Sequence, residues 1–80
     1  MPYIHPSKRD YLKGDPRPED PGELNYIITL ICKDYIDRYG ECYRTFNDIM
    51  GVLEGVKLEM YRRKTGPYED RKIKQNGDVY

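Results

Sequence analysis

Two central segments of the chain carry hydrophobic residues at the spacing of an α-helix. In the first segment, apolar residues recur at i, i+3, i+4, i+7 and i+11 on one helix face: Leu24, Ile27, Ile28, Ile31 and Tyr35. Pro21 and Glu23 suit the first turn of this helix, and Gly40 suits the position just after its last turn. The run YIITLI is also compatible with a β-strand, but length and capping residues favour a helix. The pattern therefore predicts a helix over about residues 23–39.

The second segment begins with Thr45 and Asp48, a T-x-x-D pattern that is typical of a helix N-terminus. Apolar residues then follow at three- and four-residue spacing: Phe46, Ile49, Leu53, Val56 and Met60. This pattern predicts a helix over about residues 46–63. Gly51 and Gly55 interrupt the helix, and each glycine costs about 1 kcal/mol relative to alanine. Since glycines one turn apart let another backbone approach closely, we expect Gly51 and Gly55 to mark a helix–helix contact.

The arrangement expected for these elements is an all-α antiparallel hairpin, because the connection Gly40–Arg44 is short. Tyr26, Leu30 and Tyr39 lie off the main stripe of the first helix, so its apolar surface is wider than one neighbouring helix needs. A domain of 80 residues also buries only a small core. The sequence therefore predicts a homo-oligomer, in which a second subunit covers the surplus apolar surface.

The two ends of the chain are expected to form irregular arms of this single domain, residues 1–22 and 64–80. Five prolines interrupt the N-terminal arm, where Ser7 and Asp10 allow only a helical turn or two over Lys8–Lys13. In the C-terminal arm, Pro67 predicts a turn, Tyr68 and Ile73 fall in one further helical turn, and Asn76-Gly77 predicts a tight turn. The aromatic and turn residues of this arm predict an ordered segment that wraps the hairpin or a neighbouring subunit.

Composition and charge exclude several classes of protein. The net charge is +0, so no global field attracts the chain to duplex nucleic acid or to a membrane surface. No apolar run approaches the ~20 residues of a membrane span and no signal-peptide pattern opens the chain, so a cytoplasmic location is expected. Cys32 and Cys42 are too few for a disulfide framework, and His5 is the one histidine. The cysteine and histidine spacing therefore predicts neither a zinc site nor a Cys–His nucleophile.

Carboxylates on the second helix raise the question of a magnesium site, as in all-α nucleotide pyrophosphohydrolases. Such a site needs acids three or four residues apart on facing helices, whereas Glu54 and Glu59 are five apart. Glu54 is placed to pair with Lys57, and Glu59 with Arg62 or Arg63. We therefore predict no metal, no cofactor and no catalytic residue, with the hydrolase kept as a second alternative.

Cations and tyrosines at the end of the second helix and in the C-terminal arm are the strongest candidates for ligand binding. Arg and Lys suit phosphate groups, and a Tyr ring can stack on a nucleotide base. The candidate residues are Tyr61, Arg62, Arg63, Tyr68, Arg71 and Lys72. Some of the cations would also stabilise the helix C-terminus through its dipole.

Several segments of the chain resemble a family of short, phage-encoded proteins of unassigned function: MPYI, LNYIIT, NDIMGVLEGVKLEMYRR, PYED and NGDVY. The resemblance spans nearly the whole chain and implies a phage or prophage setting. In that setting we expect a non-enzymatic anti-defence protein that sequesters a nucleotide immune signal, such as a cyclic dinucleotide. The alternative is a small interaction protein that binds and inhibits a host protein through the same tyrosine-rich and arginine-rich surface.

Overall fold

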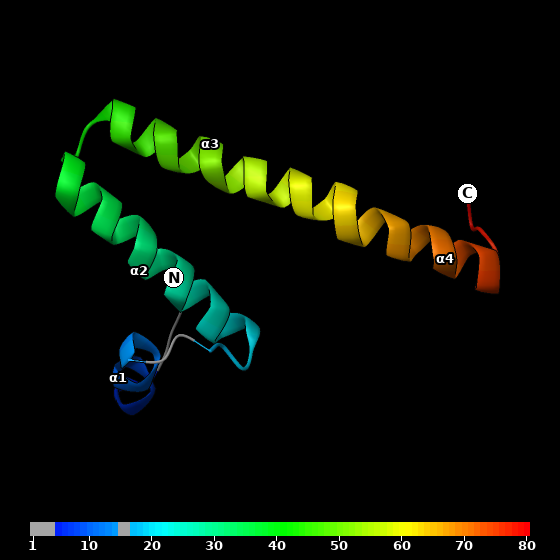
Figure 1. Ribbon diagram of the computed structural model, residues 1–80, viewed down its shortest axis with the longest axis horizontal. Helices are drawn as coiled ribbons and strands as arrows, with labels where there is room; N and C mark the ends of the chain where they lie inside the picture. The colour runs from blue at the N-terminus through cyan, green and yellow to red at the C-terminus, as the bar shows by residue number, and fades with distance from the viewer. Residues whose placement is uncertain (1–4, 15–16) are drawn as a thin grey trace. The chain divides into compact units, whose positions relative to one another are not determined.

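The computed structural model describes residues 5–14 and 17–80, without the side chains of residues 10–12. Four α-helices and one π-helical turn occupy most of this part of the chain (Figure 1): α1 Pro6–Gly14, α2 Pro21–Tyr39, α3 Tyr43–Met60, η1 Tyr61–Thr65 and α4 Gly66–Asn76. The described residues contain no strand, so the predicted all-α class is confirmed. The chain divides into two compact units between Phe46 and Asn47, and each unit is described by itself.

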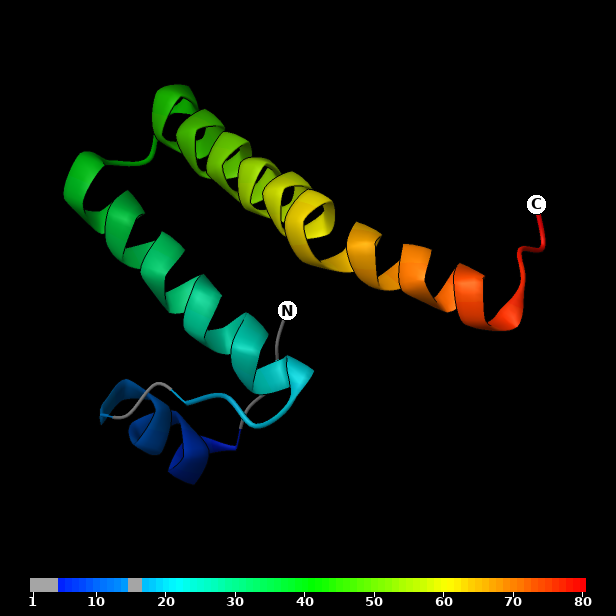
Figure 2. The same cartoon turned by 45° about the vertical axis from the view of Figure 1, so that its right-hand side comes forward.

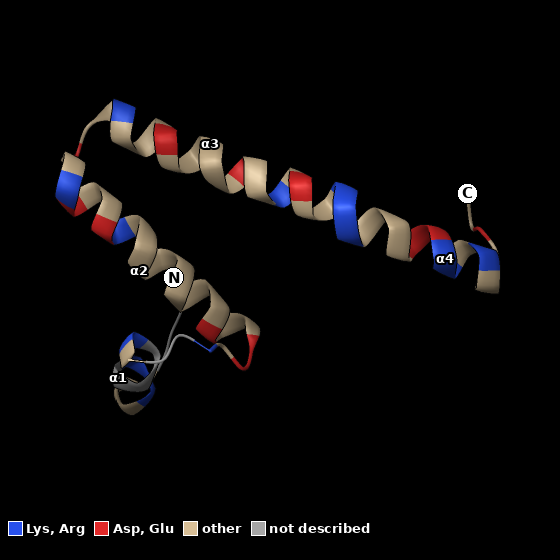
Figure 3. Cartoon of the chain, viewed as in Figure 1, with Lys and Arg blue, Asp and Glu red and all other residues tan. Residues whose placement is uncertain are grey.

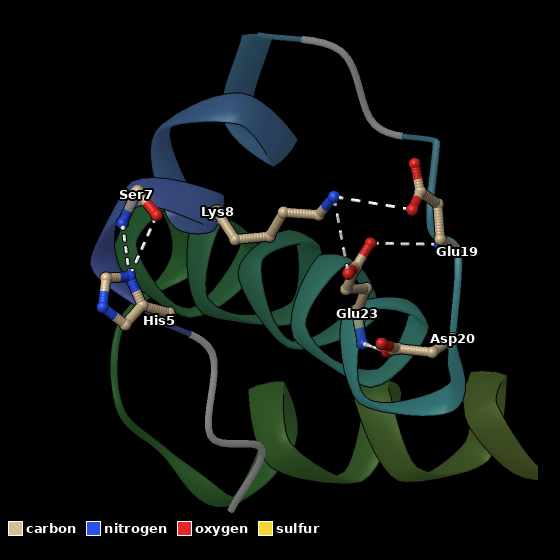
Figure 4. Close-up of polar contacts among 6 residues, drawn as sticks. All are labelled: His5, Ser7, Lys8, Glu19, Asp20 and Glu23. Carbon is tan, nitrogen blue, oxygen red and sulfur yellow. Dashed lines mark hydrogen bonds and ion pairs between the residues drawn. The ribbon is translucent and has the colours of Figure 1, made fainter.

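Helix α2 begins with reciprocal hydrogen bonds between its first turn and the chain that precedes it. The Glu23 N–H donates to Oδ1 of Asp20 at 2.8 Å, and Oε1 of Glu23 accepts from the Glu19 N–H at 3.0 Å (Figure 4). Pro21 lies in the first turn, as predicted. At the other end Gly40, with φ +91°, donates its N–H to the Ile36 carbonyl at 2.7 Å. The predicted helix is thus confirmed and begins two residues earlier than expected.

Helix α1 contacts α2 on the side that carries Glu23. Glu23 is only 7% exposed, and its Oε2 lies 3.7 Å from Nζ of Lys8 in α1. Tyr26 and Leu30 follow Glu23 by three and seven residues, so they share its side of the helix, and both are half-buried. Part of the apolar surface that the sequence assigned to a second subunit therefore lies on the side of α2 that α1 contacts. Most of the main stripe is exposed, with Leu24 49%, Ile28 39% and Ile31 66% exposed, whereas Ile27 and Tyr35 are half-buried.

The helical turn or two predicted over Lys8–Lys13 is part of a longer helix, so the irregular N-terminal arm is wrong for residues 6–14. Pro6 opens it, where the missing N–H costs nothing. The carbonyl of His5 accepts from the amides of Lys8 and Arg9, and its Nδ1 accepts from the Ser7 N–H at 3.3 Å (Figure 4). His5 therefore caps this helix, whereas Ser7 lies inside its first turn.

Helix α3 starts at Tyr43, before the Thr45 predicted to cap it. The Phe46 N–H donates to the Cys42 carbonyl at 3.1 Å, so Cys42 precedes the first turn. Thr45 is only 3% exposed, and its Oγ1 lies 3.4 Å from Sγ of Cys42. The threonine hydroxyl thus contacts the thiol instead of capping the helix, which corrects the predicted start.

The irregular C-terminal arm is also wrong, because α3 continues through η1 into α4 (Figures 1 and 2). In a regular α-helix the ring of Pro67 would clash with the carbonyl four residues earlier. The chain instead makes the wider turn η1, in which the Gly66 N–H reaches back to the Tyr61 carbonyl. Helix α4 ends at Gly77, with φ +85° and its N–H 2.8 Å from the Ile73 carbonyl. Asn76-Gly77 therefore ends a helix and is not a separate turn.

Gly51 and Gly55 lie on a different face of α3 from its apolar stripe. Each follows a stripe residue, Ile49 or Leu53, by two positions, which is a rotation of about 200° around the helix. A Cβ added at either glycine would meet no atom within 4 Å in the described chain. The close helix contact predicted at these glycines stays a prediction. None of the described helices is long and apolar enough to cross a membrane.

Candidate functional site

The six residues predicted to bind a ligand all lie on η1 and the first half of α4. Lys and Arg residues recur along this segment (Figure 3). Between Tyr61 and Asn76 the chain carries six cations and two acids. Hydrogen bonds, ion pairs and ring contacts divide the six predicted residues into three groups.

The first group is Arg62 and Arg63, which both pair with Glu59 one turn earlier. Nη2 of Arg62 lies 3.3 Å from Oε1 of Glu59, and Nε of Arg63 donates to the same oxygen. The predicted pairing of Glu59 is confirmed. Such exposed pairs contribute only about 0–1 kcal/mol, and the two arginine side chains are 73% and 69% exposed. Both guanidinium groups therefore stay accessible to an anion.

The second group is Tyr61, whose hydroxyl is engaged by an acid of α4. A hydrogen bond to the Glu69 carboxylate, together with its negative charge, raises the pKa of Tyr61. A Cβ on Gly66 would lie 4.0 Å from Cε1 of the Tyr61 ring, so this ring runs past the glycine. The Tyr61 side chain thus extends along the helix toward Glu69 and connects η1 with α4.

The third group is Tyr68 with Arg71 and Lys72, and it is the one that the structure brings together as a mixed aromatic and cationic site. The Arg71 guanidinium carbon lies 5.8 Å from the centre of the Tyr68 ring, and Nζ of Lys72 lies 5.5 Å from it. Both distances are within the range of a cation–π contact. Within the described part of the chain, neither cation forms an ion pair. Their positive charge is therefore available to a ligand.

A shallow hollow of about 300 Å³ lies beside this group, between α4 and the last residues of the chain. Its walls come from one side of α4 and from the C-terminal residues: Glu69, Lys72, Ile73, Asn76, Gly77, Asp78, Val79 and Tyr80. Tyr68 and Arg71 do not line it. The sequence did not predict this hollow, because it depends on the path of the chain after Gly77, where the Tyr80 N–H donates to Oδ1 of Asp78 at 2.9 Å.

The carboxylates considered for a magnesium site are engaged in ion pairs or stand apart. Oε1 of Glu54 lies 3.8 Å from Nζ of Lys57, as predicted, and Glu59 pairs with the two arginines. Among the described residues no three His, Cys, Asp or Glu side chains group together as metal ligands. The arrangement of these acids gives no support to a hydrolase.

Cys42 is a position that sequence reasoning did not single out, with surroundings that favour the thiolate. Its thiol is exposed and free, as Cys32 is free. Hydrogen bonds from the Thr45 hydroxyl and from the backbone amides of Thr45 and Arg44 lower the pKa of Cys42. The C-x-x-T spacing just before an amphipathic helix was the available sequence pattern.

A protein-family model matches residues 1–79, and its description is Domain of unknown function (DUF6899). The match covers nearly the same part of the chain as the resemblance drawn from the sequence. No curated protein and no solved structure matches the chain significantly.

Proposed function

We propose that this chain, which belongs to the DUF6899 family, is a non-enzymatic binding protein for a small anionic ligand, with a nucleotide as the best candidate. The observation that carries the proposal is the group formed by Tyr68, Arg71 and Lys72. It joins an exposed aromatic ring to two cations that form no ion pair within the described residues.

Each member of the group has a definite chemical role toward a nucleotide. The Tyr68 ring offers a surface on which a base stacks. Arg71 binds phosphate oxygens with its planar guanidinium, and Lys72 adds a point charge. Arg62 and Arg63 lie on the same helical segment and supply further positive charge. Sequestration requires no catalytic group, and in the phage setting that the resemblance implies, the ligand would be a nucleotide immune signal such as a cyclic dinucleotide in the host cytoplasm.

The proposal includes an antiparallel hairpin of α2 and α3. Much of the main stripe of each helix is exposed in the structure, with Ile31 66% and Val56 56% exposed. Helix α2 has 19 residues and α3 has 18, so the two are about 28 Å and 27 Å long. Two apolar stripes of equal length, joined by a short connection, bury each other best when the helices pair antiparallel. An isolated amphipathic helix gains most of its stability from such packing.

Titration calorimetry with a panel of mononucleotides and cyclic dinucleotides tests the proposed binding. The double variant Arg71→Gln/Lys72→Gln should weaken the binding of the best ligand about tenfold or more, because it removes two charge-assisted contacts. Arg38→Gln is the matched control, since Arg38 pairs with Asp34 on α2 at 3.1 Å, away from this segment. If no nucleotide binds the parent protein, or if both variants bind equally well, the proposal fails.

A second candidate, an interaction protein that inhibits a host protein, is favoured by the open surface at Tyr68. The tyrosine is 53% exposed and does not line the hollow beside α4, whereas small-molecule sites usually enclose most of their ligand. Tyr and Arg are also frequent hot-spot residues at protein interfaces. In this case Tyr68→Ala should abolish the capture of one host protein, and nucleotides should not compete with that capture.

A further inference from the structure

Helix α2 is too short to cover the whole helical stretch that follows the connection at Gly40. In the proposed hairpin its 19 residues match α3 alone, which has 18. The segments η1 and α4, with 5 and 11 residues, would then continue about 20 Å beyond the start of α2. We call Tyr61–Asn76 the extension.

The extension needs contacts that its own unit does not supply. Tyr68 and Ile73, its larger apolar side chains in α4, are 53% and 42% exposed. Pro67 removes a backbone hydrogen bond, and α4 is a polar helix of 11 residues that, within the described residues, contacts no element other than η1. A surface that packs along the extension would therefore stabilise its folded form.

Charge indicates what that surface is. The extension carries six cations and two acids, whereas the chain from Pro21 to Met60 carries seven acids and four cations. The complete chain has a net charge of +0, and the excess of four cations on the extension is nearly balanced by the excess of three acids between Pro21 and Met60. A second copy of the chain offers the acidic surface that the extension would attract.

We propose that two copies of this chain associate in antiparallel orientation, so that the extension of each copy lies along the α2–α3 hairpin of the other. A parallel pair would place extension against extension and repel, whereas the antiparallel pair joins opposite charges at two equivalent contacts. This inference rests on the hairpin included in the proposed function. It goes beyond ligand binding because it assigns the partner of the extension.

The dimer can be tested by reversing the charge of exposed residues that form no ion pair within the described part of the chain. Asp37 lies in the last turn of α2, where the helix dipole disfavours an acid, and Glu41 follows in the connection. Lys64 and Lys74 lie on the extension, and both are exposed. None of these four residues belongs to the Tyr68, Arg71 and Lys72 group, so their substitution tests the dimer separately from ligand binding.

Sedimentation equilibrium at micromolar concentration is the first measurement. The parent protein should be a dimer at about 0.05 M salt, with a dissociation constant that rises about tenfold or more at about 0.5 M salt. Asp37→Lys/Glu41→Lys and Lys64→Glu/Lys74→Glu should each be monomeric. An equimolar mixture of these two double variants should form a heterodimer, because each restores the complementary charge of the other. Circular dichroism of each variant verifies that it remains helical.

Carbodiimide cross-linking of a mixture of ¹⁴N- and ¹⁵N-labelled protein establishes the orientation. Mixed-isotope links should join Lys64 or Lys74 to acids between Asp34 and Glu59. A monomeric parent protein, a dimer unaffected by salt and by both double variants, or mixed-isotope links confined to the extensions would overturn the proposal. Loss of nucleotide binding in a protein that still forms this dimer would refute the proposed function alone.

Discussion

At the residue scale, the hydroxyl of Thr45 contacts the thiol of Cys42 and favours its ionised form. The threonine is buried and its hydroxyl lies 3.4 Å from the thiol, which is exposed at the start of α3. Hydrogen bonds to the thiolate lower the pKa of Cys42, so more of the nucleophilic form is present at neutral pH.

Thr45→Val should therefore slow the alkylation of Cys42 near pH 7 and move the midpoint of its pH–rate profile upward. The rate of iodoacetamide labelling at Cys42, read by peptide mass spectrometry, measures this shift. Thr45→Ser keeps the hydroxyl and should behave like the parent protein. An unchanged midpoint in Thr45→Val would show that the threonine does not act on the thiol.

Pro67 alters the backbone that precedes it, because its ring cannot follow a regular α-helical turn and the chain forms the π turn η1 instead. Pro67→Ala restores an N–H and removes the clash, so a regular α-helix should replace η1. Helix stability should then rise by about 1–3 kcal/mol, judged by thermal unfolding. Without the extra residue of the π turn, α4 rotates about the helix axis relative to Tyr61, and Glu69 moves away from the Tyr61 hydroxyl. The raised pKa of Tyr61 should therefore fall toward its ordinary value, as followed by an NMR titration.

Glu69→Gln is the control for this experiment, since it removes the charge without altering the turn. It should lower the pKa of Tyr61 and leave the backbone chemical shifts of Tyr61–Thr65 close to those of the parent protein. A π turn that persists in Pro67→Ala would mean that Gly66 or a tertiary contact, and not the proline, causes it.

At the scale of elements, the sequence predicted those helices whose stability comes from a regular apolar stripe. Helix α2 was recognised from its stripe and from Pro21 and Gly40. Helix α1 was predicted only as a turn or two over Lys8–Lys13, because its cap is a histidine, which ordinary capping rules do not favour. Helix α4 was predicted as a single separate turn because Pro67 normally ends a helix, and the π turn that accommodates it has no sequence pattern of its own.

The candidate site was predicted as a set of residue types and not as a geometry. Tyr68, Arg71 and Lys72 follow at i, i+3 and i+4, so their proximity results directly from a helix at Gly66–Asn76. The contact of Tyr61 with Glu69 depends on the rotation of α4 that the π turn η1 introduces, and on the absence of a side chain at Gly66. Those two features were accessible only from the folded backbone.

Substitutions at Gly51 and Gly55 test whether this face of α3 is open or contacts another helix, because the change in stability has opposite signs in the two cases. In an open helix face, Gly51→Ala should stabilise the protein by about 1 kcal/mol through helix propensity. We expect instead that Gly51→Leu and Gly55→Leu destabilise it by about 1–3 kcal/mol, because another backbone approaches these glycines in the assembled protein. Thermal unfolding at a fixed protein concentration measures the difference. Stabilisation by every substitution at both positions would remove the predicted helix contact.

At the scale of the whole molecule, a chain with a net charge of +0 has its excess of cations and its excess of acids on different elements. The cations gather on η1 and α4, and the excess of acids lies between Pro21 and Met60. The same segment thus carries the proposed ligand group and the charge that attracts a second copy. Both proposals require that this basic segment is a folded surface and not a frayed tail.

Amide hydrogen exchange of the intact protein at micromolar concentration tests that requirement most directly. Amides from Arg62 to Asn76 should exchange many times more slowly than in a free peptide, with protection that approaches that of α3. Exchange at free-peptide rates throughout this segment, in a protein whose α3 amides are protected, would contradict the account.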